Sequence, residues 1–335
     1  MNYSLGNMLN GGESLNADGL SLDLQFATDK TLVARRGPTP TFTRASTATF
    51  VGSNGLIQSA AINQARFDHD PVTLACKGLL MEQSTTNLVF PSATLTTQTR
   101  TVTAVAHTLS FYGTGTVVLS GVASATVTGT GAYPTRTTLT FTPTAGSLTL
   151  TVTGSVTEAQ LEAGSFPTSY IPTTTASAVR AVDVCSITGS AFTEFYNQSE
   201  GTLFAQTKKT STNINAFMLS VSDNTFNNGH DLRYTDITTA SSLTNVSNVS
   251  QATGFTGTIT SGATTKQIMA YKLNDYAYSL NGAASITDTV ALVPTVNRLN
   301  IGAAYNNTQV GNGHIQSILY YKKRLPNAKL QTLTT

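Results

Sequence analysis

FTRASTATFVGSNGLIQSAAINQARFDHDPVTLACKGLLMEQSTTNL, the stretch Phe42–Leu88, decides the fold of this chain. Its β-favouring segment Thr49–Val51 is followed by the turn-forming cluster Gly52–Gly55, and a second β-favouring segment comes at Leu56–Gln58. Two short strands on either side of a Gly/Asn turn are typical of a β-hairpin. A further strand, Arg66–Asp68, ends before an Asp-Pro turn signal. The stretch therefore predicts short strands joined by turns.

The order of the motifs in this stretch also resembles a known family. TRASTATF, GLIQSAA, ARFDHDPVT and GLLMEQSTTNLV follow one another as in the head-spike or fibre module of tailed-bacteriophage structural proteins. The resemblance implies that residues 21–91 form this module, and that the chain is part of a virion rather than a metabolic enzyme. It also implies synthesis in the host cytoplasm, a place on the surface of the phage head or tail, and other capsid or tail proteins as partners.

Composition favours an all-β fold. Apolar residues make up 40% of the 335 residues and charged residues 11%, whereas an ordinary globular chain has about 25% charged residues. Low charge with this much apolar content argues against disorder. Thr and Val suit the half-buried surface of a strand, and turn signals recur about every 8–12 residues, as in β-sandwiches. We expect tandem antiparallel β-sandwich domains of the jelly-roll or lectin-like kind.

Charge and hydropathy exclude two classes of partner. The net charge is +2, and the basic residues are scattered, so we expect no nucleic-acid partner. No window approaches about 18 consecutive apolar residues, so we expect no membrane insertion. The first residues, MNYSLGNMLNGG, lack the basic start and apolar run of a signal peptide.

Residues 92–172 predict a small sandwich. Alternating apolar and polar residues, bounded by Gly or Pro, mark five strands: 108–112, 115–120, 125–129, 137–142 and 147–152. The motifs AQLEAG and PTSYIPT that follow resemble the closing strand and linker of carbohydrate-binding-module-like sandwiches in phage fibre proteins. The low-complexity sequence TTTASAVRAVDV predicts a linker over residues 173–184.

Residues 185–335 predict a larger sandwich. The segment Lys266–Tyr271 is expected to pair with Asp275–Gly282. The order SLNG, LNIGA and HIQSILYYKKRLPNAKLQTL resembles laminin-G or concanavalin-A-like lectin domains. In that pattern the last motif ends in a short helix with Leu330 and Leu333 on one face.

Two loops of this larger sandwich carry the residue types that bind sugars. Asn and Asp side chains exchange hydrogen bonds with hydroxyl groups, and aromatic rings stack on the C–H faces of sugars. Both loops have a second interpretation, in which Asn and Gly only form the turns. Only two carboxylates occur in them, so we expect no Ca²⁺ site, no other metal and no cofactor. The candidate glycan-binding residues are Asp223, Asn224, Asn227, Asn228, His230, Asp231, Tyr305, Asn306, Asn307 and Asn312.

The first 20 residues are polar and rich in Gly and Asn. Tyr3, Leu5, Met8 and Leu9 are apolar at near-helical spacing, but the segment is too short to fold alone. We interpret residues 1–20 as a peptide that anchors the chain to a virion protein. The alternative is a frayed terminus.

The motifs of catalysis are missing from the sequence. It has no nucleophile elbow, metalloprotease motif or phosphate loop, and no carboxylate pair stands out as a glycosidase pair would. Cys76 and Cys185 are too few for a disulfide scaffold, so we expect thiols, with a single bridge as the alternative. We predict no enzymatic activity.

The functional prediction joins these observations. We expect a head- or tail-attached phage fibre or spike that displays a lectin-like domain to host-surface polysaccharide. The alternatives are a capsid decoration (cement) protein that binds no glycan and, from another class, a glycan depolymerase. Fibre proteins form symmetric homo-oligomers, and the family resemblance suggests a trimer.

Overall fold

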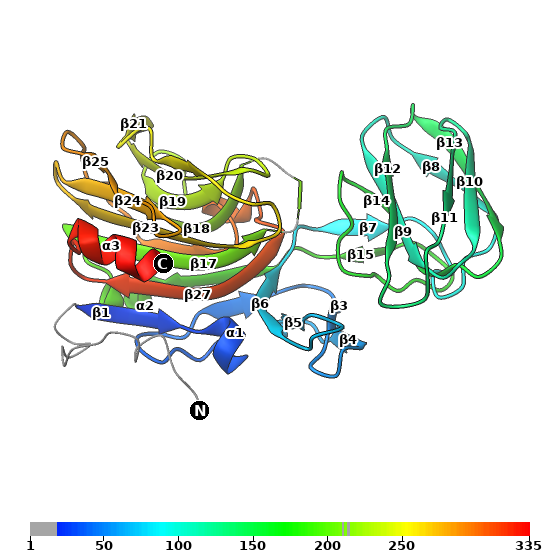
Figure 1. Ribbon diagram of the computed structural model, residues 1–335, viewed down its shortest axis with the longest axis horizontal. Helices are drawn as coiled ribbons and strands as arrows, with labels where there is room; N and C mark the ends of the chain where they lie inside the picture. Colours follow the sequence, from blue (N-terminus) through cyan, green and yellow to red (C-terminus); the bar gives the residue numbers. More distant parts are fainter. Residues whose placement is uncertain (1–18, 210, 213–214) are drawn as a thin grey trace. The chain divides into compact units, whose positions relative to one another are not determined.

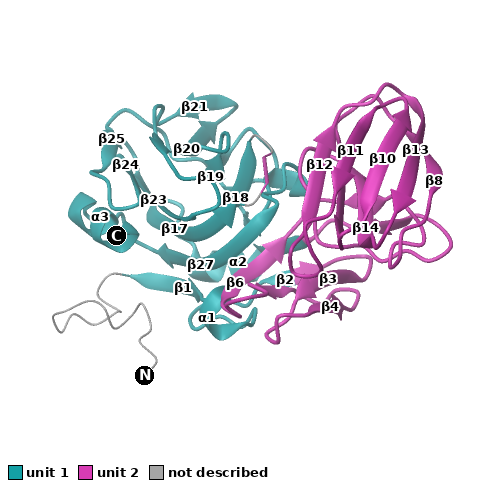
Figure 2. Ribbon diagram, turned by 45° about the vertical axis from the view of Figure 1, so that its right-hand side comes forward, with its two compact units in different colours: residues 1–41, 184–210, 214–335 teal, residues 42–183, 211–213 magenta. Residues whose placement is uncertain are grey.

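The computed structural model describes residues 19–209, 211–212 and 215–335 (Figure 1). The chain divides into two compact units, coloured separately in Figure 2. Unit 1 comprises residues 1–41, 184–210 and 214–335, and unit 2 comprises residues 42–183 and 211–213. Nearly all regular structure is antiparallel strand, so the all-β prediction is confirmed. The anchoring residues Tyr3, Leu5, Met8 and Leu9 lie outside the described residues.

Unit 1 is a sandwich of two antiparallel sheets. The strands of the first sheet follow the spatial order β25 (Ile286–Asp288), β24 (Tyr276–Leu280), β23 (Thr264–Lys272), β17 (Glu200–Lys209), β27 (Gly313–Tyr321) and β1 (Leu20–Leu24). The strands of the second follow the order β16 (Val184–Thr188), β26 (Arg298–Ile301), β18 (Ala216–Ser222), β19 (Gly229–Tyr234), β20 (Thr239–Val246) and β21 (Val249–Gln251), and β22 (Thr256–Thr258) also pairs with β20. The expected pairing of residues 266–271 with 275–282 is confirmed as β23 with β24.

The core between the two sheets of unit 1 is rich in tyrosine. The His230 ring of β19 stacks on Tyr271 of β23 with ring centroids 4.4 Å apart, and the hydroxyl groups of Thr207 and Tyr234 lie 2.7 Å apart. Each buried hydroxyl needs a partner, and these contacts cross from sheet to sheet. Helix α2 (Gly189–Phe195) adds Phe195, whose ring meets Tyr320 edge-on at 5.5 Å.

The opposite face of the first sheet is covered by α3 (Asn327–Thr334). Leu330 is fully buried there among Phe204, Ile268 and Leu319, with Leu333 packed against the same cluster, so the predicted terminal helix is confirmed. The other helical segments of the described residues are α1 (Phe26–Asp29) and η2 (Tyr305–Asn307). None of the helices in the described residues has the length and apolar character needed to cross a membrane.

Unit 2 combines small strand pairs with a sandwich. The predicted hairpin is present as β3 (Ala48–Val51) and β4 (Ile57–Ala60). Strands β5 (Phe67–His69) and β6 (Cys76–Met81) pair next to it in sequence, and β7 (Thr85–Asn87) pairs with β15 (Ala178–Arg180). A further short strand, β2 (Thr41–Thr43), lies at the start of the unit.

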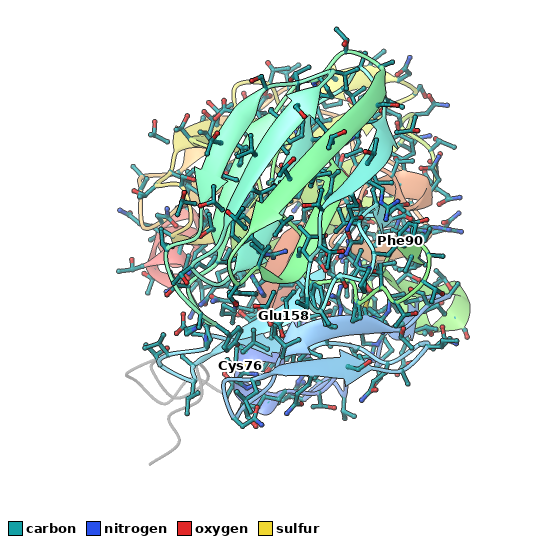
Figure 3. All side chains as sticks on the ribbon, turned by 90° about the vertical axis from the view of Figure 1, so that its right-hand side faces the viewer. Cys76, Phe90 and Glu158 are labelled. Carbon is teal, nitrogen blue, oxygen red and sulfur yellow. The ribbon has the colours of Figure 1, made fainter. Side chains whose placement is uncertain are left out.

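The sandwich of unit 2 contains the five strands predicted over residues 108–152. One sheet has the order β11 (Ala125–Thr128), β10 (Thr116–Gly121), β13 (Gly146–Thr153) and β8 (Gln98–Val102), and the other has the order β12 (Thr137–Phe141), β9 (His107–Tyr112) and β14 (Thr157–Ala163). Leu109, Phe111, Val117, Leu148 and Leu161 are among the buried residues between them. Neither Cys76, which is labelled in Figure 3, nor Cys185 forms a disulfide in the described chain.

The compact units group the chain differently from the expected domain boundaries. Residues 42–91 and 92–172 belong to one unit, and β1 belongs to the same unit as residues 215–335. The segment 173–184, expected to be a linker, contains β15. It also contains the fully buried Arg180 and Asp183. The physical reason is a network of ion pairs that composition does not reveal.

The network lies inside unit 2 and joins residues that are far apart in sequence. Arg66 pairs with Glu82, with Nη1 2.7 Å from Oε2, and its other terminal nitrogen pairs with Asp183. Arg44 reaches Asp183 at 3.1 Å, and Arg180 reaches Glu82 at 3.1 Å. All five side chains are at most 7% exposed. Segments near the start of the unit and the segment at its end are therefore tied together at one point.

Hydrogen bonds complete the network, because buried ions lose their hydration at a cost of several kcal/mol each. Ser169 donates to the two oxygens of Glu82 from its backbone N–H at 2.7 Å and its hydroxyl at 2.6 Å. The backbone N–H of Glu82 donates to Asp183 at 2.9 Å. Burial opposes ionisation of Glu82, but Arg180, Arg66 and Ser169 outweigh it and hold the pKa of this carboxyl well below its usual value.

The first prediction concerns this network. Glu82→Gln should lower the free energy of unfolding of unit 2 by about 3–5 kcal/mol, because it leaves two buried guanidinium groups without their shared carboxylate. Denaturant unfolding measures the loss. The control is Arg35→Gln, which removes the partner of Asp29 from a pair whose side chains are 30% and 25% exposed and should cost about 1 kcal/mol or less.

Acidification provides the matching pH test. The pKa of Glu82 in the folded chain lies below its ordinary value of 4.5, so its ionisation stabilises the fold above that pH. The contribution declines as the pH falls further, and Glu82→Gln should show a shallower acid dependence than the wild type. Equal acid dependence in both proteins would contradict the ionised network.

Candidate functional site

The two loops predicted to bind glycan meet at one edge of unit 1. Residues 223–228 connect β18 to β19, and η2 lies in the connection that follows β26. The backbone N–H of Asn306 donates to the side-chain oxygen of Asn224 at 3.0 Å. The rings of Phe226 and Tyr305 lie beside each other, with centroids 5.7 Å apart and planes tilted by 55°. Segments about 80 residues apart in sequence thus form one surface, called here the ring edge (residues 223–228 and 305–307).

The first loop of the ring edge is held by its own hydrogen bonds. Asp223 accepts from the backbone N–H of Thr225 at 2.8 Å and from its hydroxyl at 2.6 Å. Its other carboxylate oxygen accepts from the Asn228 amide at 2.9 Å. Burial opposes this charge, but these hydrogen bonds outweigh it and lower the pKa of Asp223. Because both oxygens are engaged, Asp223 shapes the loop rather than offering a ligand.

A third segment, which the sequence analysis did not select, supports the same loop. The backbone N–H of Ser247 donates to the Asn228 side chain at 3.0 Å, and that of Asn248 donates to the Asn227 carbonyl at 2.9 Å. The Asn245 amide donates to the Phe226 carbonyl at 3.0 Å. Residues at the β20–β21 turn therefore hold the loop through hydrogen bonds of their own. Its sequence NVSN carries the turn signal that would have identified it.

Several asparagines of the ring edge adopt left-handed backbone conformations. The φ angles are 76° for Asn224, 48° for Asn306 and 61° for Asn307. Asn tolerates this region better than most residues do, so the turn-forming interpretation holds for the backbone. In the described part of the chain, the side-chain amides of Asn227, Asn306 and Asn307 make no hydrogen bond to protein. These amides are left for a ligand.

Phe226 is the residue of the ring edge that the candidate set lacked. It is 40% exposed, an unusual exposure for a phenylalanine side chain. An aromatic residue at the tip of a polar loop was the signal available in the sequence DNTFNNG. Its ring and that of the half-buried Tyr305 form an aromatic pair flanked by amides.

Three candidate residues do not reach the surface, which corrects the expected site. His230 is fully buried, and burial lowers its pKa to about 3, so the ring is a neutral part of the core. Asn312 is 3% exposed, and its amide donates to the Val310 carbonyl at 3.1 Å. Asp231 is 5% exposed. The physical reason for His230 and Asp231 is that β19 already begins at Gly229, so both belong to a strand and not to a loop tip. Asn312 lies directly before β27, which begins at Gly313.

Asp231 lies on the sheet face opposite to His230, since neighbouring strand residues point to opposite faces. Its register partner on β18 is Ser220. Among the described residues, its Oδ1 atom has no hydrogen-bond partner. Burial raises the pKa of Asp231 to about 7, against smaller opposing effects of Ser220 and Arg233. The carboxyl therefore carries its proton through mildly acidic pH.

The other chemistry sought in the sequence was metal ligation. Across residues 19–209, 211–212 and 215–335, no group of three or more His, Cys, Asp or Glu side chains is arranged to hold a metal ion.

Comparison with known proteins gives remote likenesses only. No protein-family model matches the chain, and neither does any curated protein. Among solved structures, the Ruminococcus gnavus IT-sialidase CBM40 bound to α2,3-sialyllactose is 17% identical, with a TM-score of 0.34 over 41% of this chain and 83% of that one. The NanB sialidase from Streptococcus pneumoniae is 14% identical, with a TM-score of 0.37 over 44% of this chain and 26% of that one.

A third similar structure comes from another functional class. The binding domain of botulinum neurotoxin DC, in complex with rat synaptotagmin II, is 9% identical, with a TM-score of 0.34 over 46% of this chain and 40% of that one. At these scores the likenesses carry no weight for fold or function. The fold therefore rests on the strand pairing of this chain, and its function on the geometry of its own site.

Asp231→Asn tests the protonated state of this buried carboxyl. A folded-state pKa near 7, above the ordinary 3.8, means that ionisation destabilises the fold, so stability falls as the pH rises between these values. The stability of the variant relative to wild type should increase over that window by up to about 1.4 kcal/mol per pH unit, and then level off. Unfolding titrations at several pH values measure the difference.

Asp236→Asn is the matched control in the same unit. Hydrogen bonds from Thr238 lower the pKa of the exposed Asp236, so this variant should lose stability relative to wild type as the pH rises. If the two variants followed the same trend, the assignment of Asp231 as a protonated buried carboxyl would be wrong.

Proposed function

We propose that this chain is a structural protein of a tailed-bacteriophage virion, a head- or tail-attached fibre or spike, and that its ring edge adheres to host-surface glycan. The single observation that carries the glycan proposal is the contact between the exposed Phe226 ring and the half-buried Tyr305 ring, flanked by Asn amides that make no hydrogen bond to the described protein. Aromatic rings stack on the C–H faces of sugars, and amides both donate and accept hydrogen bonds. This combination suits a pyranose ring.

The rigidity of the ring edge supports the same proposal. Hydrogen bonds from Asn306 and Asn248 hold the Phe226 loop from two sides, so little conformational entropy is lost when a ligand binds. Preorganised sites gain affinity in this way. Loops on a rigid β scaffold commonly carry binding function.

The virion part of the proposal is supported by the sequence resemblance and by where its residues lie. Arg44 belongs to TRASTATF, Arg66 to ARFDHDPVT and Glu82 to GLLMEQ. All three meet in the buried ion network. The motifs that resemble the phage module are thus motifs that contribute to holding unit 2 together.

Glycan binding by the whole chain tests the proposal. The wild-type protein should bind bacterial surface polysaccharide on a glycan array, and Phe226→Ala or Tyr305→Ala should weaken binding by at least about tenfold, as truncation of a central aromatic contact does. Leu292→Ala, which trims another exposed apolar side chain of unit 1, is the control and should bind as wild type does.

The outcomes separate the candidate functions. If Phe226→Ala and Tyr305→Ala both bound glycan as the wild type does, the ring edge would not be the adhesion site. A chain that binds capsids but no glycan would instead be a decoration protein, and release of reducing sugar would reveal a depolymerase.

A further inference from the structure

Unit 2 contains a cleft of about 360 Å³ that the ring-edge proposal does not use. Its lining comes from several strands of the unit: Thr86 on β7, Thr101 on β8, Thr103 just after β8, His107 at the start of β9 and Ala163 at the end of β14. Clefts of about 300 Å³ and more are of the size that holds small ligands. Thr101, Thr103 and Ala163 are exposed, so the cleft opens to solvent.

Hydroxyl groups around the cleft are available to a ligand. In the described part of the chain, the side chains of Thr86, Thr101 and Thr103 make no hydrogen bond to protein. Ser84, at the same cleft, differs because its hydroxyl donates to the Arg180 carbonyl at 3.1 Å. A hydroxyl group has one donor and two acceptor sites, so the three threonines offer a set of both kinds around one small volume.

His107 adds an acceptor with a defined tautomer. Its Nδ1 lies 2.9 Å from the Val105 carbonyl oxygen, and a carbonyl only accepts, so a neutral ring carries its proton on Nδ1. Nε2 is then a lone-pair acceptor. Within the described chain Nε2 has no protein partner. It is not one of the fully buried atoms that lack a hydrogen bond, so it is accessible. Since His107 lines the cleft, a hydroxyl of a ligand in the cleft is the natural donor to Nε2.

The rest of the lining is aliphatic and uncharged. Leu88, Val102 and Ala163 provide carbon surface, and the described lining includes no Asp, Glu, Lys or Arg. The cation nearest in sequence, Arg100, points elsewhere: its guanidinium carbon lies 3.5 Å from the centroid of the Phe90 ring, which is labelled in Figure 3. An ionised ligand would lose hydration in the cleft without meeting an opposite charge.

We propose that this cleft is a second carbohydrate-binding site, one that takes a single neutral sugar residue. Its hydroxyl and imidazole groups match the hydroxyls of the sugar, and its aliphatic surface matches the C–H edges. The proposal goes beyond adhesion through the ring edge, because it places a separate site of different chemistry, without an aromatic pair, on the other unit.

Titration of the full chain with neutral methyl glycosides, both hexoses and 6-deoxyhexoses, tests the proposal, with sialic acid as the charged comparison. Ligand-observed NMR detects weak binding. Ala163→Phe fills the cleft from an exposed position and removes no buried contact, so it should weaken binding of the neutral sugar by at least about tenfold. Thr103→Phe fills the cleft from a second exposed position and guards against a single variant that misfolds, and the thermal transition of each variant verifies its fold.

Phe226→Ala serves as the background for this comparison, because it disables the proposed ring-edge site and leaves the cleft intact. Retained binding of neutral sugar by Phe226→Ala, with loss when Ala163→Phe or Thr103→Phe is added to it, would support the cleft. Neutral-sugar binding that is absent in Phe226→Ala, or that survives in both folded double variants, would overturn it. If sialic acid bound in the cleft as strongly as the neutral sugars do, the assignment of the cleft to neutral sugars would be wrong. If the ring edge bound no glycan, these outcomes for the cleft would be unchanged.

Discussion

The buried ion network of unit 2 is the interaction on which the arrangement of that unit depends. Arg44, Arg66 and Arg180 converge on Glu82 and Asp183, so segments separated by up to 139 residues meet at one point. Removing one of these side chains leaves buried charge that is less compensated and not hydrated, which costs more than the loss of a surface pair would. The network therefore fixes which segments meet, whereas the sandwich strands supply most of the apolar burial.

Further hydrogen bonds connect the surroundings of the ion network to the neighbouring strands. Thr168 donates its backbone N–H to Glu162 at 2.9 Å and accepts from Arg180 at 3.0 Å. Asn87 donates to the Ala159 and Ile171 carbonyls at 3.0 and 2.8 Å. Through these contacts β7, β14 and β15 are positioned by polar groups as much as by packing. The cleft described above has β7 and β14 among its walls, so its shape depends on the same hydrogen bonds.

In unit 1 the constraint is different. Its core is aromatic, and the stacked His230 and Tyr271 rings lock two sheets face to face. That rigid sandwich lets short loops carry an exposed phenylalanine without collapse of the loop onto the core. Asp223, Asn224 and Asn228 use side-chain atoms in hydrogen bonds that hold the loop in place. The groups left over for a ligand are few, and they are rigidly placed.

Local patterns in the sequence predicted most of the strands and the terminal helix, because alternation and turn residues are local signals. The hairpin at Ala48–Ala60 and helix α3 are examples. The ion network was not predicted, since pairing of Arg44 with Asp183 is a long-range contact that leaves no periodic trace. Two members of the network, Arg180 and Asp183, lie within residues 173–184, whose low-complexity sequence predicts a linker.

The site was predicted in part for a similar reason. Asn224 and Asn306 were selected by residue type, and the structure brings them together. His230 and Asp231 were selected by the same rule, yet their strand begins one residue earlier and buries both. Composition identifies a polar loop but not the residue at which the loop ends. Phe226 lies in the same loop, and the sequence alone does not show that its ring is 40% exposed.

The most direct test of glycan adhesion by the ring edge is hydrogen–deuterium exchange of the full chain with and without bound bacterial polysaccharide. Binding at the ring edge predicts slower exchange in peptides that contain residues 223–228, 246–249 and 305–307, which adjoin one another in unit 1. Slower exchange confined to other segments, or no change under conditions where the polysaccharide is bound, would contradict it.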